Sequence, residues 1–113
     1  MLLELLASTI LWVGIDLNHD AKLEVACDKV TLDYGGDPTA RDKVVTFWMQ
    51  DLRHDHTHIY GVAMPVDVHG RIVLEPAKFW VEEIRQQKNL TIRVGKFDYY
   101  FELNGTYKSI NCN

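Results

Sequence analysis

Three histidines stand at every second position of the stretch RHDHTHIYG, residues 53–61. They are His54, His56 and His58, in a chain that has only five histidines, and Asp55 lies between the first two. On a β-strand, alternate side chains project from the same face. Three imidazoles on one face are therefore a candidate site for Zn(II), Ni(II) or Cu(II).

Strand geometry limits this candidate metal site. Alternate side chains of a straight strand are about 6–7 Å apart, too far for three of them to converge on one tetrahedral ion. The stretch also lies between two apolar segments, Lys43–Leu52 and Ile59–Val66, a position typical of a solvated hairpin loop. Two interpretations remain open: a metal site, or a hairpin tip with no cofactor.

Other catalytic groupings are scarce in the sequence. Ser8 and Ser109 lack the glycine pattern of a nucleophile elbow, and the chain has no glycine-rich phosphate-binding loop. A small hydrolase that combines the histidines with Asp51 or Asp55 is the enzymatic alternative. We expect the protein not to be an enzyme.

Length, composition and charge indicate one small globular domain, residues 1–113. A chain of 113 residues has single-domain size and can bury about two-thirds of its unfolded surface. Hydrophobic residues make up 47% and charged residues 25%, which argues against disorder. The 12 Lys and Arg are scattered and the net charge is -4, which argues against a nucleic-acid partner.

Residues 1–21 form an apolar amino-terminal segment that has several interpretations. Leu2–Ile15 are almost all apolar, but Glu4 interrupts the run, and no Lys or Arg precedes it as in a typical signal peptide. The run is shorter than the about 20 apolar residues of a transmembrane helix, so we expect no integral membrane span. A signal remnant, a short helix leading into a buried first strand around Thr9–Leu17, and a membrane anchor remain alternatives.

The pattern of residues 22–112 predicts mostly β-strands. Segments rich in Val, Ile, Thr and aromatic residues are separated by turn signals. These segments are Lys22–Tyr34, Lys43–Leu52, Ile59–Val66, Arg71–Leu74, Asn89–Gly95 and Phe97–Leu103. The last two alternate in a way that predicts an antiparallel hairpin with one buried face. That face comprises Leu90, Ile92, Val94, Phe97, Tyr99, Phe101 and Leu103.

One segment has the period of a helix instead. Ala77, Trp80, Val81 and Ile84 fall on one helical face, which predicts a short amphipathic helix at about residues 76–88 with Pro76 in its first turn. The expected fold is mainly β, at the border of α+β. It is a small antiparallel β-sandwich or open barrel with one short amphipathic helix.

The two cysteines lie near opposite ends of this pattern. A bond between Cys27 and Cys112 would close nearly the whole domain, as expected for an extracytoplasmic disulfide. A pair of buried free thiols is the alternative.

The chain has more aromatic residues than one small core needs. Tyr100 falls on the polar face of its predicted strand, and Trp48 lies next to Phe47 in another. Exposed aromatic side chains dominate the binding energy of many interfaces. Trp48, Tyr60 and Tyr100 are therefore the candidates for binding a partner.

The order of these motifs resembles the small bacterial family of type VI secretion-associated TagO/VasI-like proteins, which has phage-borne members. The shared features are a first cysteine in a strand, a turn glycine before a short strand, a proline-led helix, a Leu-x-Val-type strand, and a closing Phe-x-Leu-x-Gly before a late cysteine. The matching positions, within about residues 22–112, are Cys27, Gly70, Pro76, Phe79, Leu90, Ile92, Val94, Phe101, Leu103, Gly105 and Cys112. The resemblance implies a disulfide-closed, β-rich extracytoplasmic domain that serves as an accessory protein without a known catalytic centre.

We therefore expect a non-enzymatic accessory or protein-binding module of the bacterial envelope, whose partner is another protein. An inhibitor or immunity-type protein against a cell-wall enzyme is an alternative that differs only in its partner. The expected location is periplasmic or secreted. Because the sequence lacks the features of a typical signal peptide, a cytoplasmic location is the alternative.

Overall fold

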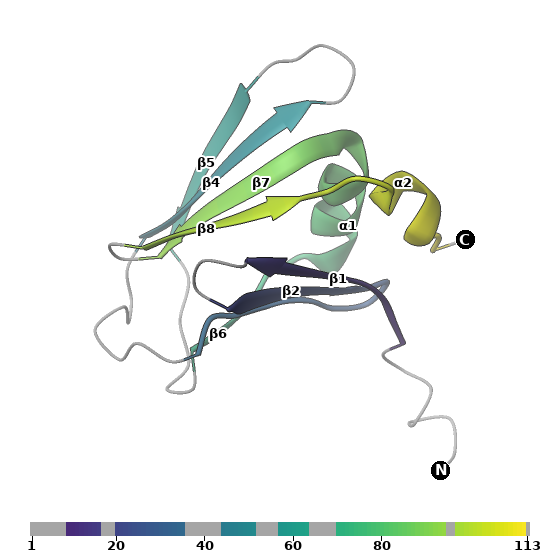
Figure 1. Ribbon diagram of the computed structural model, residues 1–113, viewed down its shortest axis with the longest axis horizontal. Coiled ribbons are helices and arrows are strands. Elements are labelled where there is room, and N and C mark those ends of the chain that lie inside the picture. The colour runs from purple at the N-terminus through teal and green to yellow at the C-terminus, as the bar shows by residue number, and fades with distance from the viewer. Residues whose placement is uncertain are drawn as a thin grey trace.

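Two four-stranded antiparallel sheets face each other and form a sandwich (Figure 1). The structure, a computed structural model, describes residues 9–16, 20–35, 44–51, 57–63, 70–94 and 97–112, and the backbone alone at 44, 50–51, 57–60 and 62–63. Sheet A has the strand order β1-β2-β3-β6, and sheet B has the order β5-β4-β7-β8. The strands are β1 (Ile10–Asp16), β2 (Ala21–Ala26), β3 (Val30–Asp33), β4 (Val44–Asp51), β5 (Thr57–Ala63), β6 (Arg71–Val73), β7 (Gln87–Val94) and β8 (Phe97–Glu102). The mainly-β sandwich expected from the sequence is confirmed.

The inner faces of the two sheets supply the core. In β4, Val45, Phe47 and Met49 are buried, whereas Thr46 and Trp48 between them are half-buried. The same alternation runs along β2, β3, β7 and β8, because successive side chains of a strand point to opposite faces. Fully burying one large apolar side chain contributes about 1.5–3 kcal/mol, so this shared core is the main source of stability.

The predicted hairpin of β7 and β8 is confirmed, apart from one residue. Its two strands pair from Asn89 with Glu102 to Val94 with Phe97, and the expected apolar face is otherwise buried. Phe97 was expected in the core, but it is 42% exposed. The reason is that β8 is an edge strand and only β1 lies beside it on that edge. Tyr100 is already next to Asp16, the last residue of β1, so Phe97 lies beyond the end of β1 and is not covered by it.

The segment Lys22–Tyr34, expected as one strand, is two strands with a turn between them. The backbone N–H of Ala26 donates to the carbonyl of Lys29 at 2.8 Å, and the chain reverses there, so that β2 and β3 pair as a hairpin. The family pattern implied that Cys27 lies in a strand, but it lies in this turn. A 13-residue strand would also be longer than most strands, which have about 3–10 residues.

The predicted helix is α1, Ala77–Gln86, and it is shorter than the expected residues 76–88. Of the predicted apolar face, Trp80, Val81 and Ile84 are buried and Ala77, the first residue of the helix, is half-buried. The ring centroids of Trp80 and Phe47 lie 4.5 Å apart. Pro76 precedes the helix, and Gln87 is already extended because β7 begins there.

A second helix, α2 (Thr106–Ser109), was not expected from the sequence. It begins after Gly105, whose φ of 83° is a left-handed conformation that glycine adopts most readily. The buried hydroxyl oxygen of Thr106 lies 3.0 Å from the carbonyl oxygen of Ile84 in α1 and 2.9 Å from that of Leu103. This hydroxyl and the contact of Arg85 with the carbonyl of Tyr107 join the two helices at one end of the sandwich (Figure 1). Neither of the described helices has the length and apolar character needed to cross a membrane.

The strands β1 and β8, edge strands of different sheets, lie side by side and form a seam (Figure 1). The buried carboxylate of Asp16 accepts the backbone N–H of Tyr100 at 3.2 Å. β1 lies within the range Thr9–Leu17, where a first strand was one of the alternatives. A hydrogen bond to a side chain thus links the two sheets at this seam.

The expected disulfide joins Cys27 and Cys112, whose Cα atoms are 5.5 Å apart. It ties the turn between β2 and β3 to the end of the chain after α2, across a sequence separation of 85 residues. A cross-link that closes so long a loop restricts the unfolded chain, and in the chain-entropy model it contributes about 4–5 kcal/mol.

Replacing both cysteines, Cys27→Ala/Cys112→Ala, should lower the free energy of unfolding by about 2–5 kcal/mol, because the unfolded chain regains the entropy of an open loop. Urea unfolding followed by circular dichroism measures the loss. Reductant should shift the wild-type midpoint toward that of the variant and leave the variant unchanged. A wild-type midpoint that does not respond to reductant that has fully opened the disulfide would contradict the stabilising role.

Gly14→Ala should destabilise the protein by about 1–3 kcal/mol, as overpacking does elsewhere. An added Cβ would lie 2.5 Å from Cη2 of Trp12 and 3.3 Å from Cδ1 of Phe101, so a ring must move. Urea unfolding measures the cost, which should be smaller in a Trp12→Leu background because the obstructing ring is gone. Equal costs in the two backgrounds would show that the Trp12 contact does not matter.

Candidate functional site

The outer face of sheet B gathers aromatic, charged and hydroxyl side chains. Because the residues of one parity are buried in β4, β7 and β8, the residues of the other parity lie on the outside. We call this surface the Trp48 face, and it consists of Thr46, Trp48, Thr91, Arg93, Asp98 and Tyr100. Its composition therefore follows from the same alternation that builds the core.

Strand register arranges the Trp48 face in two adjacent rows. Trp48 pairs with Thr91, which pairs in turn with Tyr100, so one row places an aromatic residue on each side of a threonine. The next row is Thr46, Arg93 and Asp98. Directly opposite residues have Cβ atoms about 4.5–5.5 Å apart, so the side chains of each row are neighbours.

Arg93 connects the two rows. Its Nε donates to Oδ1 of Asp98 at 2.7 Å and its Nη2 donates to Oδ2 at 3.0 Å, a bidentate ion pair. The guanidinium carbon also lies 5.1 Å from the ring centroid of Trp48, within the range of a cation–π interaction. The hydrogen bond to Asp98, and then the charge of that carboxylate, raise the pKa of Arg93.

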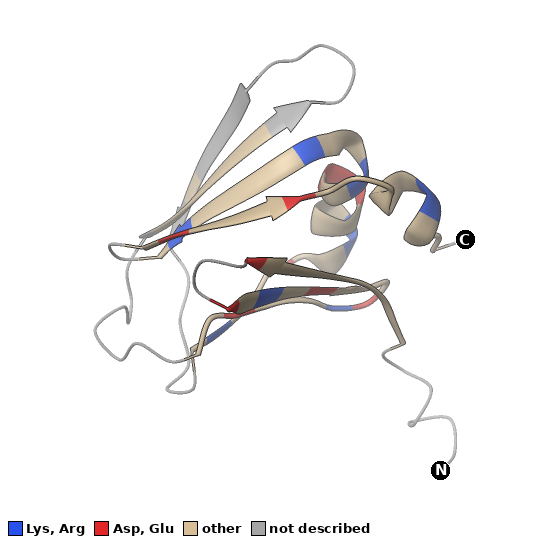
Figure 2. Ribbon diagram, viewed as in Figure 1, with Lys and Arg blue, Asp and Glu red and all other residues tan. Residues whose placement is uncertain are grey.

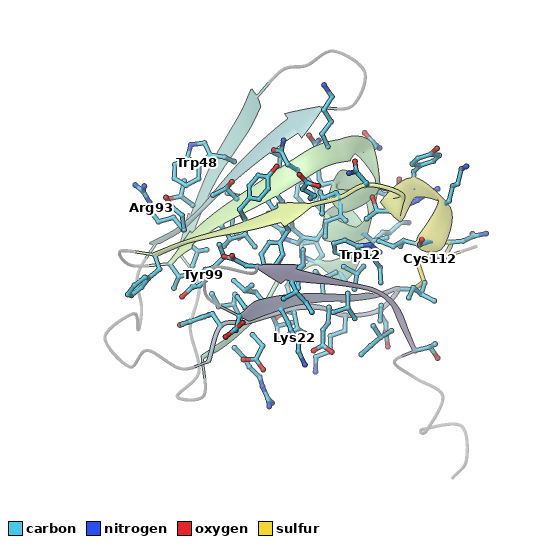
Figure 3. All side chains as sticks on the ribbon, viewed as in Figure 1. Trp12, Lys22, Trp48, Arg93, Tyr99 and Cys112 are labelled. Atoms are coloured by element: carbon cyan, nitrogen blue, oxygen red, sulfur yellow. A yellow bond between two sulfur atoms is a disulfide. The ribbon has the colours of Figure 1, made fainter. Side chains whose placement is uncertain are left out.

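The Trp48 face is open to solvent. Tyr100 is 45% exposed, and the side chains of Arg93 and Asp98 are 51% and 45% exposed. Among the described elements, α1 lies on the inner side of sheet B, where Trp80 contacts Phe47, so it does not cover this surface. Figure 3 shows Trp48 and Arg93 next to each other on the side of sheet B that faces away from sheet A.

The chemistry of this surface suits binding. Aromatic rings and a guanidinium held in place by a carboxylate provide apolar contact, stacking and directed hydrogen bonds. Trp, Tyr and Arg are also the residues most enriched among the energetic hot spots of protein interfaces.

Two of the three predicted partner-binding residues are brought together. Trp48 and Tyr100, which are far apart in the sequence, lie in the same row. Tyr60 does not belong to that row, because its Cα partner in β4 is Phe47, whereas the partner of Trp48 is Ile59. The side chain of Tyr60 lies outside the described part of the structure.

The predicted metal ligands fall mostly outside the described residues. This holds for His54 and His56 entirely, while the backbone of His58 lies in β5 opposite Met49. Residues 52–56 connect the antiparallel neighbours β4 and β5. Within the described ranges, no group of three His, Cys, Asp or Glu side chains is placed to hold a metal ion. The histidine metal site remains a prediction.

The ion pair of Arg93 and Asp98 was not predicted, although the positions of the two residues in the sequence indicate it. Val94 and Phe97 are the last pair of a hairpin connected by residues 95–96, so the next pair outward is Arg93 with Asp98. Two residues of opposite charge placed symmetrically about a two-residue connection are cross-strand neighbours. The placement of Trp48 beside them could not be found this way, because it depends on pairing of β4 with the distant β7.

No family model matches this chain, and neither does any curated protein or any solved structure. The proposed function is therefore argued from the residues of the Trp48 face.

Asp98→Asn should leave the urea midpoint unchanged within error but alter the fluorescence of Trp48. The ion pair is exposed, so it contributes little to folding, whereas its loss frees Arg93 to leave the Trp48 ring. Emission spectra, compared with those of a Trp48→Phe variant, isolate this tryptophan from Trp12 and Trp80.

Glu82→Gln is the matched control for this prediction. It removes one carboxylate from another exposed pair, with Arg85 at 3.4 Å in α1, and should not affect Trp48 emission. An equal spectral change in both variants, or none in Asp98→Asn, would contradict the described arrangement of Arg93.

Proposed function

We propose that this protein is a non-enzymatic accessory module that binds another protein of the bacterial envelope through the Trp48 face. The observation that carries the proposal is the row of half-buried Trp48 and exposed Tyr100 on the outer face, next to Arg93. An aromatic surface of this kind is costly to leave in water and gains most when a partner covers it.

Preorganisation of Arg93 supports the same proposal. Immobilising a long side chain on binding costs about 0.5–1.5 kcal/mol of entropy. Asp98 and the Trp48 ring already hold the guanidinium in one place, which reduces that cost. The pair is also formally neutral, so the partner we expect offers apolar groups and hydrogen-bond acceptors and needs no strong opposite charge.

The disulfide supports the location in the proposal. Disulfides form and persist in oxidising compartments such as the bacterial periplasm, and they are rare in the cytosol. Cys27 and Cys112 are joined, which favours a periplasmic or secreted protein.

The resemblance to the TagO/VasI-like family supports the accessory role. Two glycines of the shared pattern, Gly70 and Gly105, have φ angles of 77° and 83°, a conformation that most other residues adopt only with strain. The pattern thus has a structural reason at these positions. An inhibitor or immunity-type protein would use the same surface, and the identity of the captured partner distinguishes the two roles.

Tyr100→Ala should weaken partner binding by roughly thirtyfold, because truncating a hot-spot residue costs about 2 kcal/mol or more. The oxidised chain is immobilised, exposed to a periplasmic extract, and the captured proteins are quantified by mass spectrometry. A partner specific to the Trp48 face should be lost with Tyr100→Ala and with Trp48→Ala.

Tyr107→Ala is the matched control, because Tyr107 is a similarly exposed tyrosine, at 51%, on α2. This variant should retain the partner. Capture that is unaffected by both Tyr100→Ala and Trp48→Ala, or lost equally with Tyr107→Ala, would exclude the Trp48 face as the binding surface.

A further inference from the structure

The outer face of sheet A carries a hollow of about 340 Å³. Pockets for small ligands commonly have volumes of about 300–1,000 Å³, so this hollow has the size of a small-molecule site. It lies on the side of the sandwich opposite to the Trp48 face. Figure 3 shows Lys22, another outer residue of sheet A, pointing away from sheet B. We call this hollow the sheet A trough.

Strand register explains how the sheet A trough is built. Glu24 of β2 pairs with Thr31 of β3, and both line the hollow. The small side chain of Ala26, which is buried, leaves room beside Glu24 and Thr31. Ile10 of β1 is the strand partner of Ala26 and lines the hollow as well. Ile10 is 50% exposed, so the trough has an apolar wall that faces solvent.

The sheet A trough contains two acidic and two basic side chains, of which one pair is already engaged. Nε of Arg71 lies 3.6 Å from Oδ2 of Asp33, and Oδ1 of the same carboxylate accepts the backbone N–H of Gly35 at 3.2 Å. Figure 2 shows acidic and basic segments close together along β2 and β3. The charges of Asp33 and Arg71 therefore compensate each other.

Glu24 and Lys29 differ from that pair. Both line the hollow, and neither side chain has a hydrogen bond or ion pair with any other described residue. Glu24 is half-buried and Lys29 is exposed. The trough thus presents one carboxylate and one ammonium group, together with the apolar wall of Ile10, to whatever enters it.

We propose that the sheet A trough binds a zwitterionic short peptide, with the free amino group at Glu24 and the free carboxylate at Lys29. Lys29 precedes Thr31, the strand partner of Glu24, by two positions, so Glu24 and Lys29 are diagonal neighbours whose Cα atoms are about 7–8 Å apart. A dipeptide covers this span between its termini. An apolar side chain of the ligand contacts Ile10.

This inference does not rest on the proposed function of the Trp48 face. The two surfaces belong to opposite sheets and share no residue. A variant in one leaves the other intact, so failure of either proposal is recognised separately.

Isothermal titration with the dipeptide glycyl-leucine tests the proposal. We expect saturable binding with a Kd of about 1 mM or tighter, a value that two charged hydrogen bonds and one apolar contact can supply. N-acetyl-glycyl-leucinamide, which has the same side chain but neither charge, should bind at least about tenfold more weakly. Equal affinity for both compounds, or no binding of glycyl-leucine, would overturn the proposal.

Glu24→Gln and Lys29→Gln should each weaken binding of glycyl-leucine at least about tenfold, because each leaves one charge of the ligand unpaired. Lys22→Gln is the matched control, since Lys22 lies exposed on the same strand face but does not line the trough. A similar loss with Lys22→Gln would show a general charge effect and overturn the site. Urea midpoints of all three variants, which should equal the wild-type value, exclude a loss through unfolding.

Discussion

The structure depends on one constraint: two sheets must bury one face each against the other, and a strand can bury only alternate residues. Once Val45, Phe47 and Met49 are committed to the core, Thr46 and Trp48 must lie on the outside. A shift of one residue in register would exchange the two sets and expose the apolar one. The core therefore determines the membership of both outer surfaces. The residues of the Trp48 face and of the sheet A trough lie outside because their strand neighbours are buried in the core.

The two outer faces differ in how their charges are arranged, and this difference separates their chemistry. On sheet B, Asp98 engages Arg93 with both carboxylate oxygens, so the guanidinium is fixed beside Trp48 and the surface is close to neutral. Such a surface favours a large partner that covers aromatic area. On sheet A, the pair of Asp33 and Arg71 leaves Glu24 and Lys29 without a side-chain partner among the described residues. Two such charges of opposite sign favour a small ligand that carries both.

Patterns of neighbouring residues in the sequence predicted local structure, but they did not predict pairings between distant segments. The alternation of Leu90, Ile92 and Val94 predicted the hairpin of β7 and β8, because its strands are joined by two residues. The turn after Ala26 was missed because residues 27–29 contain neither glycine nor proline, and the apolar pattern continues on both sides. The seam was equally hidden, since it joins Asp16 to Tyr100 across 84 positions. For the candidate site, the sequence suggested Trp48 and Tyr100 separately. Their common row required the pairing of β4 with β7.

The disulfide connects the stability of the fold to the geometry of the sheet A trough. Cys27 stands between Ala26, which lines the trough, and Lys29, which supplies its ammonium group. All three belong to the reversal closed by the hydrogen bond from Ala26 to Lys29. Cys112 ties this reversal to the end of the chain, beyond α2, which the hydroxyl of Thr106 joins to α1. The segment that presents Lys29 is therefore held from two sides, by the β2–β3 ladder and by the cross-link. A binding group on a turn is positioned well only when the turn is rigid, so oxidation of the two cysteines contributes to the trough as well as to folding.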